Sequence, residues 1–141
     1  MKYPLILCAL VILVVSFSLH SQTVAPPVNE QPTATAAVAP NYPPIARSAD
    51  ISGNVDVQVK INSRGDVEDT KVLSGHPLLQ GASKEAAKKW KFVATTEKHS
   101  RVLQLTFSFV RVESGKSVQT ITTTFLPPYK VEIVWNSTGY Q

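Results

Sequence analysis

Hydrophobic and polar residues alternate most regularly along residues 53–61. Four apolar residues share one face of this stretch: Val55, Val57, Val59 and Ile61. A period of two predicts a half-buried β-strand, here led by Gly53. The following NSRGD consists of turn-forming residue types, and we expect Gly65 to adopt a positive φ there. Residues 67–74 are expected to return as an antiparallel strand.

Residues 78–90 have a different pattern, in which apolar residues recur every three or four positions. The residues that follow this spacing are Leu79, Ala82, Ala86 and Trp90. This is the period of an amphipathic helix with one face on a sheet. Gly81 is expected to delay the regular part of the helix, because glycine costs about 1 kcal/mol relative to alanine there. Glu85 and Lys89 have the spacing of a favourable helical ion pair.

Further elements are expected before residue 53 and after residue 90. Pro43 and Pro44 suit the first turn of a short helix. Residues 101–113 alternate again, and their apolar members are Leu103, Leu105, Phe107 and Phe109. Residues 118–125 and 130–135 are β-prone, and the Leu-Pro-Pro between them forces a break. The order predicts an α+β fold, a small antiparallel sheet of three to five strands with a covering helix.

The N-terminus has the composition of a targeting segment. Lys2 is followed by an apolar run over residues 3–15 and then by small residues at Ser16, Ser18 and Ser21. Residues 1–21 are therefore expected to be a secretory signal peptide, or alternatively a short membrane anchor. Both alternatives place the rest of the chain outside the cytoplasm. The single cysteine, Cys8, lies inside the apolar run, so no disulfide is expected.

Residues 22–41 are expected to form a Pro/Ala-rich linker. They contain four prolines and one charged residue, and they lack apolar periodicity. Such a segment favours an extended spacer with about 3.1 Å per residue and a reach on the order of 60 Å. The formal charge of +4 is too small to indicate nucleic-acid binding, and no basic run is interleaved with aromatic residues.

Residues suited to catalysis or metal binding are few. His76 and His99 are the only histidines beyond the expected signal peptide, and neither lies at a metal-ligand spacing from other ligand types. His76 precedes a proline at the start of the expected helix, where a capping or turn role is the ordinary explanation. No Gly-rich phosphate loop occurs, and Ser74-Gly75 is not a nucleophile elbow. We therefore expect no enzyme activity, no metal and no cofactor.

Several residues between positions 42 and 92 also occur in the order typical of one known family. These are Tyr42, Pro43, Ala46, Arg47, Gly53, Gly65, Trp90 and Phe92. In this order and spacing the chain resembles the C-terminal domain of the TonB energy-transducer family. The resemblance predicts a TonB C-terminal-like domain at residues 42–112, followed by a C-terminal β extension at residues 113–141.

The resemblance implies a periplasmic domain that binds the TonB box of outer-membrane transporters. The TonB box is a short extended segment that pairs with the strand after the helix, and an inner-membrane motor complex driven by the proton gradient supplies force for transport. The implied contacts are Pro40, Asn41, Tyr42, Arg101, Val102, Leu103, Gln104, Leu105, Thr106 and Phe107. The side chains of Leu103, Leu105 and Phe107 have the pattern of a buried face, so the implied contact is through the backbone.

A second interpretation is a cell-envelope scaffold whose edge strand drives self-association into a homodimer. The Thr-rich C-terminal strands and an exposed region at Trp135 would serve this role. The C-terminal extension bears on both interpretations. If residues 113–141 form a hairpin on the sheet, they would cover the very edge that a TonB box needs.

Overall fold

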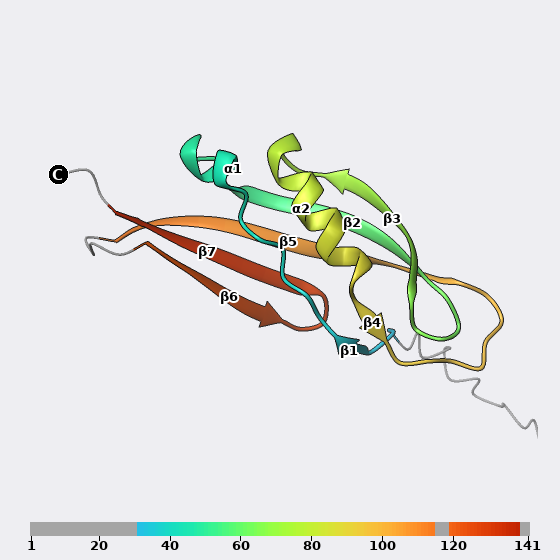
Figure 1. Cartoon of the computed structure of the whole chain (residues 1–141). Helices are drawn as coiled ribbons and strands as arrows, with labels where there is room; N and C mark the ends of the chain where they lie inside the picture. The colour runs from blue at the N-terminus through green and yellow to red at the C-terminus, as the bar shows by residue number, and fades with distance from the viewer. Residues whose placement is uncertain (1–30, 115–118, 139–141) are drawn as a thin grey trace, which may run out of the picture. The chain divides into compact units, whose positions relative to one another are not determined.

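The computed structural model describes residues 31–114 and 119–138 (Figure 1). Its elements are β1 (Ala34–Ala36), α1 (Pro44–Ser48), β2 (Gly53–Ile61), β3 (Val67–Ser74), α2 (Pro77–Lys88), β4 (Lys91–Phe92), β5 (Arg101–Ser114), β6 (Thr120–Leu126) and β7 (Lys130–Thr138). The signal peptide or anchor expected at residues 1–21 and the first part of the expected linker lie outside the described residues. Within the described part, no helix is long and apolar enough to cross a membrane.

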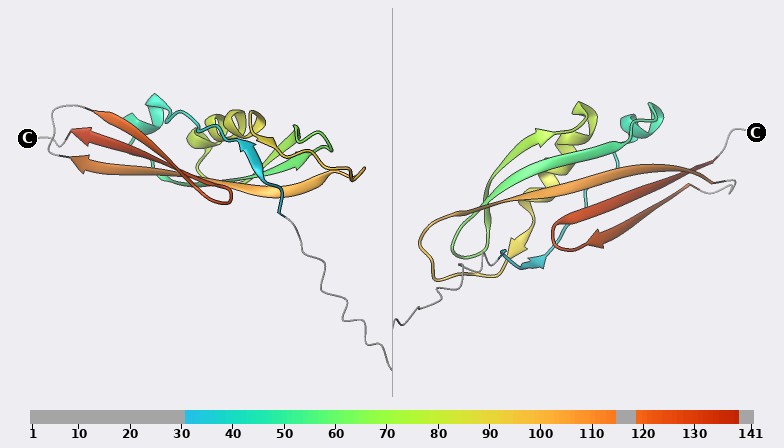
Figure 2. Two further views of the ribbon diagram at one scale, coloured as in Figure 1. Left: turned by 90° about the horizontal axis from the view of Figure 1, so that it is seen from below. Right: turned by 180° about the vertical axis from the view of Figure 1, so that it is seen from behind.

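The main sheet has five strands in the order β3-β2-β5-β7-β6. Three of its pairings are antiparallel, whereas β5 and β7 are parallel. The parallel pair arises because β6 returns along the outside of the sheet and β7 then enters between β6 and β5. Both α1 and α2 lie on one face of the sheet (Figure 2). The expected α+β fold with a covering helix is confirmed, with one parallel pair in a sheet expected to be antiparallel throughout.

The alternation in β2 produces the centre of the hydrophobic core. All four apolar side chains of its inner face are fully buried: Val55, Val57, Val59 and Ile61. The inner face of β5 continues this layer, because Val57 is paired with Leu105 and Val55 with Phe107. Leu79, Ala86 and Trp90 close the core from the helix side. The period-two pattern therefore identified the sheet layer of the core correctly. The helical pattern was correct for Leu79, Ala86 and Trp90 but wrong for Ala82, which is only partly buried, whereas Ser83 and Ala87 are buried.

Helix α2 begins directly at Pro77, so Gly81 does not delay it as we expected. The backbone N–H of Leu78 donates to Nδ1 of His76 at 3.3 Å, which confirms the capping role of this histidine. Glu85 pairs with Lys88 at 2.8 Å and not with Lys89. The expected partner was wrong because Lys89 is the C-cap residue, beyond the last helical position.

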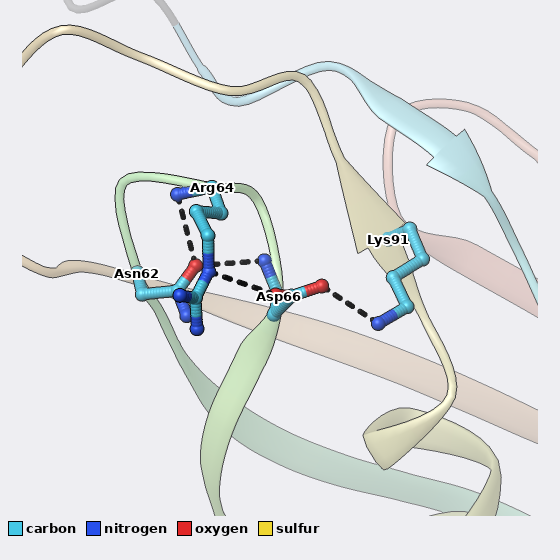
Figure 3. Close-up of polar contacts among 4 residues, drawn as sticks. All are labelled: Asn62, Arg64, Asp66 and Lys91. Atoms are coloured by element: carbon cyan, nitrogen blue, oxygen red, sulfur yellow. Dashed lines mark hydrogen bonds and ion pairs between the residues drawn. The ribbon is translucent and has the colours of Figure 1, made fainter.

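The turn between β2 and β3 is organised by Asn62 and fastened to β4 (Figure 3). The side-chain oxygen of Asn62 accepts hydrogen bonds from the backbone N–H groups of Arg64 and Asp66 at 3.0 and 2.9 Å. Gly65 has the expected positive φ, at 88°. The Asp66 carboxylate accepts a hydrogen bond from the Lys91 ammonium at 2.7 Å, and this contact lowers the pKa of Asp66. The turn thereby positions the short strand that follows α2.

Residues 31–41 belong to the same compact unit as the sheet, although their composition indicated a linker. β1 pairs with β4 in a small two-stranded sheet. The indole N–H of Trp90 donates to the carbonyl of Val38 at 2.8 Å, and Pro40 is buried. The last part of the expected linker is therefore packed onto the domain.

The C-terminal strands share the core of the domain. β5 continues without a break past residue 112 to Ser114, and β7 pairs with it from Thr106 onward. Val131 and Ile133 of β7 are fully buried. Trp135 is only 6% exposed, so the exposed region expected at this residue was wrong. It is covered because Tyr42 packs against its ring.

Candidate functional site at the sheet edges

The outer edge of β5 is largely occupied by β7. The backbone N–H of Thr106 donates to the carbonyl of Tyr129 at 3.0 Å. The backbone N–H and C=O groups of the even-numbered residues of β5 therefore point away from β2, toward β7. From Thr106 onward these positions are paired with β7. Only Val102 and Gln104 keep outward-facing backbone groups with no neighbouring strand among the described residues. Of the edge implied by the family resemblance, two residues are therefore open.

Residues 40–42 form the segment before α1, which we call the lead-in. This lead-in lies on the helix side of the sheet, across β5 and β7 (Figure 1). Tyr42 is buried, its hydroxyl donates to the carbonyl of Ile51 at 2.6 Å, and its ring packs against Phe109 with centroids 5.2 Å apart. Asn41 is exposed, whereas Pro40 is buried. The structure thus places the lead-in and the open end of β5 on different surfaces.

Most of the other implied contact residues are wholly or partly buried. Leu105 and Phe107 are fully buried in the core, and Leu103 and Thr106 are partly buried. Arg101 donates from its guanidinium to the carbonyl of Val93 at 3.0 Å. The ten implied contact residues therefore do not form one exposed surface. Those that are exposed are Asn41, Val102 and Gln104.

The family-motif residues have structural roles in this chain. Ala46, Trp90 and Phe92 are buried in the core. An added Cβ at Gly65 would lie 1.9 Å from the carbonyl oxygen of Phe92, so the close approach of the turn to β4 requires glycine. Arg47 differs from these core residues, because it lies outside the core. Its guanidinium lies over the ring of Trp135, 6.0 Å from the centroid.

β6 forms one edge of the sheet, and no strand in the described part of the chain pairs with its outer side. All seven of its residues, TITTTFL, are exposed and none is charged. The carbonyl of Tyr129 accepts a hydrogen bond from β5, so the backbone groups of the odd-numbered residues of β7 point to β5. Those of the even-numbered residues point to β6. The register with β7 then leaves three residues of β6 whose N–H and C=O groups point to the open edge: Ile121, Thr123 and Phe125.

The opposite edge, β3, is protected against strand pairing. Its sequence VEDTKVLS carries three charged residues, Glu68, Asp69 and Lys71, all of which are exposed. Charged side chains on an edge strand oppose the addition of another chain. β6 lacks this protection, so the two edges of the sheet differ in what they can accept.

An apolar groove of about 370 Å³ lies beside the end of β6. It is formed by residues 31–37 on one side and by the β6–β7 turn on the other, with Phe125, Tyr129 and Trp90 in its lining. Ile121, Thr123 and Phe125 share the sheet face of their buried partners in β7, which is the helix side. A strand added to β6 would place alternate side chains on this same face. No local sequence pattern indicates the groove, because its walls are about 90 residues apart in the chain.

Titratable side chains do not gather into a reactive cluster in the described part of the chain. No group of three His, Cys, Asp or Glu residues there has the arrangement of a metal site. His99 contacts Glu97 at 3.0 Å on the surface.

Comparison with known proteins identifies the family. The family model of the Gram-negative bacterial TonB protein C-terminal domain matches residues 38–110, just over half of the 141 residues. The chain therefore belongs to the TonB C-terminal domain family, whose members are non-enzymatic interaction domains of the cell envelope that contact outer-membrane transporters.

Solved structures also include a similar protein. The C-terminal domain of TonB from Pseudomonas aeruginosa, determined by solution NMR, is 26% identical, with a TM-score of 0.48. The match covers 57% of this chain and 87% of that one. No curated protein matches the chain.

Proposed function

We propose that this chain is a periplasmic TonB-family domain that binds the TonB box of an outer-membrane transporter by strand addition to β6. One observation carries the choice of edge. β6 is a fully exposed strand of seven uncharged residues at the border of the sheet. Family membership supports the type of partner, since domains of this family interact with outer-membrane transporters.

Two features favour β6 over the open end of β5. The first is the number of free backbone groups, because β6 directs three residues outward and β5 only Val102 and Gln104. The second is the apolar groove beside Phe125. In strand addition the main-chain hydrogen bonds supply affinity, and pockets for alternate side chains supply specificity. Among the strands that the structure describes, β6 is the one edge that combines open backbone groups with an adjacent apolar groove.

The proposal is tested with a pair of proline variants and a synthetic TonB-box peptide from a transporter of the same cell. Thr123→Pro removes an outward N–H from β6, and Gln104→Pro removes one from β5. Neither N–H takes part in the ladder with the neighbouring strand, so both positions satisfy the usual limits on proline in edge strands. Binding is measured by isothermal titration calorimetry, and folding by circular dichroism.

We expect Thr123→Pro to weaken binding at least about tenfold, which corresponds to about 1.4 kcal/mol, the net contribution of one or two hydrogen bonds. Gln104→Pro is expected to bind like the unchanged chain. The opposite pattern would place the peptide on β5, as the family resemblance implies. If both variants bind the peptide as tightly as the unchanged chain, strand addition at either edge is excluded.

The same exposed strand also favours self-association as a second candidate function. An uncharged edge can pair with the β6 of another copy. Sedimentation equilibrium of the unchanged chain and of Thr123→Lys separates the two functions. A dimer that dissociates in the lysine variant, with no peptide binding in either, would support the scaffold. A monomer that binds the peptide supports the transporter function.

In this proposal, residues 1–21 decide whether the domain can transmit force from an inner-membrane, proton-driven motor complex. A retained segment would anchor the domain to that membrane, whereas a cleaved one would release a periplasmic binding module. N-terminal sequencing of the exported protein distinguishes these outcomes. A start at Leu19 or Gln22 would exclude direct coupling through this segment.

A further inference from the structure

A pocket of about 410 Å³ lies on the helix side of the sheet, next to Trp135. Its walls come from parts of the chain that are distant in sequence. Arg47 belongs to α1, Asp50 follows α1, Arg111 belongs to β5, and Trp135 and Ser137 belong to β7. This Trp135 pocket is separate from β6 and from the apolar groove, with which it shares no lining residue.

The Trp135 pocket contains more hydrogen-bond donors than acceptors. Four buried atoms have no hydrogen-bond partner among the described residues: Nε of Arg47, Nε of Arg111, Nε1 of Trp135 and Oγ of Ser137. The three nitrogens can only donate, and the hydroxyl is able to donate. Trp135 is 6% exposed and Ser137 only 3%, so bulk water does not readily satisfy them. Because buried donors are normally paired, this set indicates a missing acceptor.

The charges around the Trp135 pocket favour a negatively charged acceptor. The Arg47 and Arg111 guanidinium carbons lie 6.0 and 5.8 Å from the centroid of the Trp135 ring. Arg47 has no carboxylate within ion-pair distance in the described part of the chain. Two guanidinium groups with an N–H and a hydroxyl are the donor set that carboxylate and phosphate groups prefer.

Arg111 already contacts two carboxylates at the rim. Its Nε lies 3.1 Å from Oδ1 of Asp50, without the alignment of a hydrogen bond, and its Nη2 lies 3.2 Å from Oε1 of Glu113. The side chains of Asp50 and Glu113 are 54% and 69% exposed, so water screens both contacts. Asp50 lines the pocket and would compete with an incoming anion for Arg111.

We infer that the Trp135 pocket is an oxyanion-binding site for a carboxylate or a phosphate group. Arg47 and Arg111 supply the charge, and the Trp135 N–H and the Ser137 hydroxyl supply further donors. The sequence did not indicate this site, because its residues are spread over positions 47–137 and no local pattern brings them together.

The two tryptophans of the chain allow a direct test by ¹H–¹⁵N NMR. The Trp90 indole N–H already donates to Val38 at 2.8 Å, so it serves as an internal control. The full chain is titrated with sodium phosphate, with N-acetylglutamate amide, and with sodium chloride at equal ionic strength. We expect the Trp135 indole signal to shift saturably, with a Kd on the order of 1 mM or tighter at low salt, where ionic contacts are least screened. The arm with the lower Kd identifies the source of the oxyanion.

Matched variants test the roles of the charged residues. Arg47→Met is expected to weaken binding at least about tenfold, because it removes a charge-assisted donor. Arg64→Met removes the same charge from an exposed turn and should bind like the unchanged chain. Asp50→Asn removes the competing carboxylate and should tighten binding severalfold. Asparagine tolerates the positive φ of 53° at this position.

Two results would overturn the inference. One is a Trp135 signal that stays unmoved in both oxyanion arms, or that moves equally in chloride. The other is an Arg47→Met variant that titrates like Arg64→Met while its Trp90 signal shows an intact fold. Neither result bears on peptide binding at β6, since the two sites share no residue.

Discussion

The indole ring of Trp135 packs edge-on against the phenol ring of Tyr42, with ring centroids 5.9 Å apart. Tyr42 begins the block of family-motif residues, and Trp135 lies in β7, near the end of the described chain. The same phenol ring packs against Phe109 of β5. This aromatic cluster joins the C-terminal strands to the family domain, so β7 contributes to the stability of the whole sheet.

Replacing Trp135 should therefore destabilise the domain strongly. Trp135→Ala removes a buried aromatic side chain and leaves a cavity beside Tyr42, for which we expect a loss of about 3 kcal/mol in the free energy of unfolding. Phe125→Ala is the control, because Phe125 lies on β6 and is 48% exposed. Its loss should be no more than about 1 kcal/mol. Urea denaturation measures both, and equal losses would contradict an integral role for β7.

Two glycines should respond to alanine in opposite directions. Gly65 has a φ of 88°, and an added Cβ would lie 1.9 Å from the carbonyl oxygen of Phe92. Gly65→Ala should therefore destabilise the domain by at least about 1 kcal/mol. At Gly81 in α2 a Cβ meets nothing within 4 Å, so Gly81→Ala should stabilise by up to about 1 kcal/mol. Thermal unfolding followed by circular dichroism gives both signs, and a stabilising Gly65→Ala would refute the close approach.

Local patterns predicted most of the fold. The alternation around Val57 specified which face of β2 is buried, and the spacing from Leu79 to Trp90 specified the sheet-facing side of α2. The strand order was not predictable in the same way. Alternation in β7 shows that one face is buried, but a strand pairs with its neighbours through backbone groups that every residue carries. The insertion of β7 beside β5 therefore left no trace in the sequence.

The candidate sites were less predictable than the fold. The implied contacts on β5 came from a family pattern, and the pairing of Thr106 with Lys130 changed which backbone groups are open. The linker composition of residues 31–41 concealed an ordered segment, because the bond from Trp90 to Val38 uses a main-chain carbonyl. Such an acceptor has no sequence signature.

Asp56 should titrate at lower pH than an ordinary aspartate. Its carboxylate accepts hydrogen bonds from Thr106 at 2.7 Å and from Ser74 at 2.8 Å, and the bond from Thr106 contributes most to lowering its pKa. The charged form is thus favoured in the folded state. The resulting stability is present above about pH 4 and is lost as the pH falls through the folded pKa.

Thr106→Val tests this cause, because it removes the hydroxyl and keeps the β-branched shape. We expect the pKa of Asp56 to rise, as measured by ¹³C NMR titration of the carboxyl groups. Asp66 is the control within the same sample, since its pKa is lowered by Lys91. An unchanged Asp56 titration, or a matching rise at Asp66, would contradict the assignment to Thr106.

The hydroxyl of Tyr129 should control how firmly β1 is held. This hydroxyl donates to the carbonyl of Pro32 at 2.6 Å, and the neighbouring Thr33 accepts from the N–H of Val93 at 2.8 Å. Tyr129→Phe removes only the hydroxyl, so it should cost about 1 kcal/mol. The loss should be local, because β1 contacts the rest of the described chain chiefly through β4.

Hydrogen exchange at the Val93 amide measures this local loss. We expect exchange to accelerate about fivefold in Tyr129→Phe, which corresponds to about 1 kcal/mol in the free energy of local opening. Tyr42→Phe is the matched control, since the Tyr42 hydroxyl donates to Ile51, beside α1. Its Val93 amide should exchange at the original rate. Equal acceleration in both variants would show that β1 opens only when the whole domain unfolds, and the role assigned to Tyr129 would be wrong.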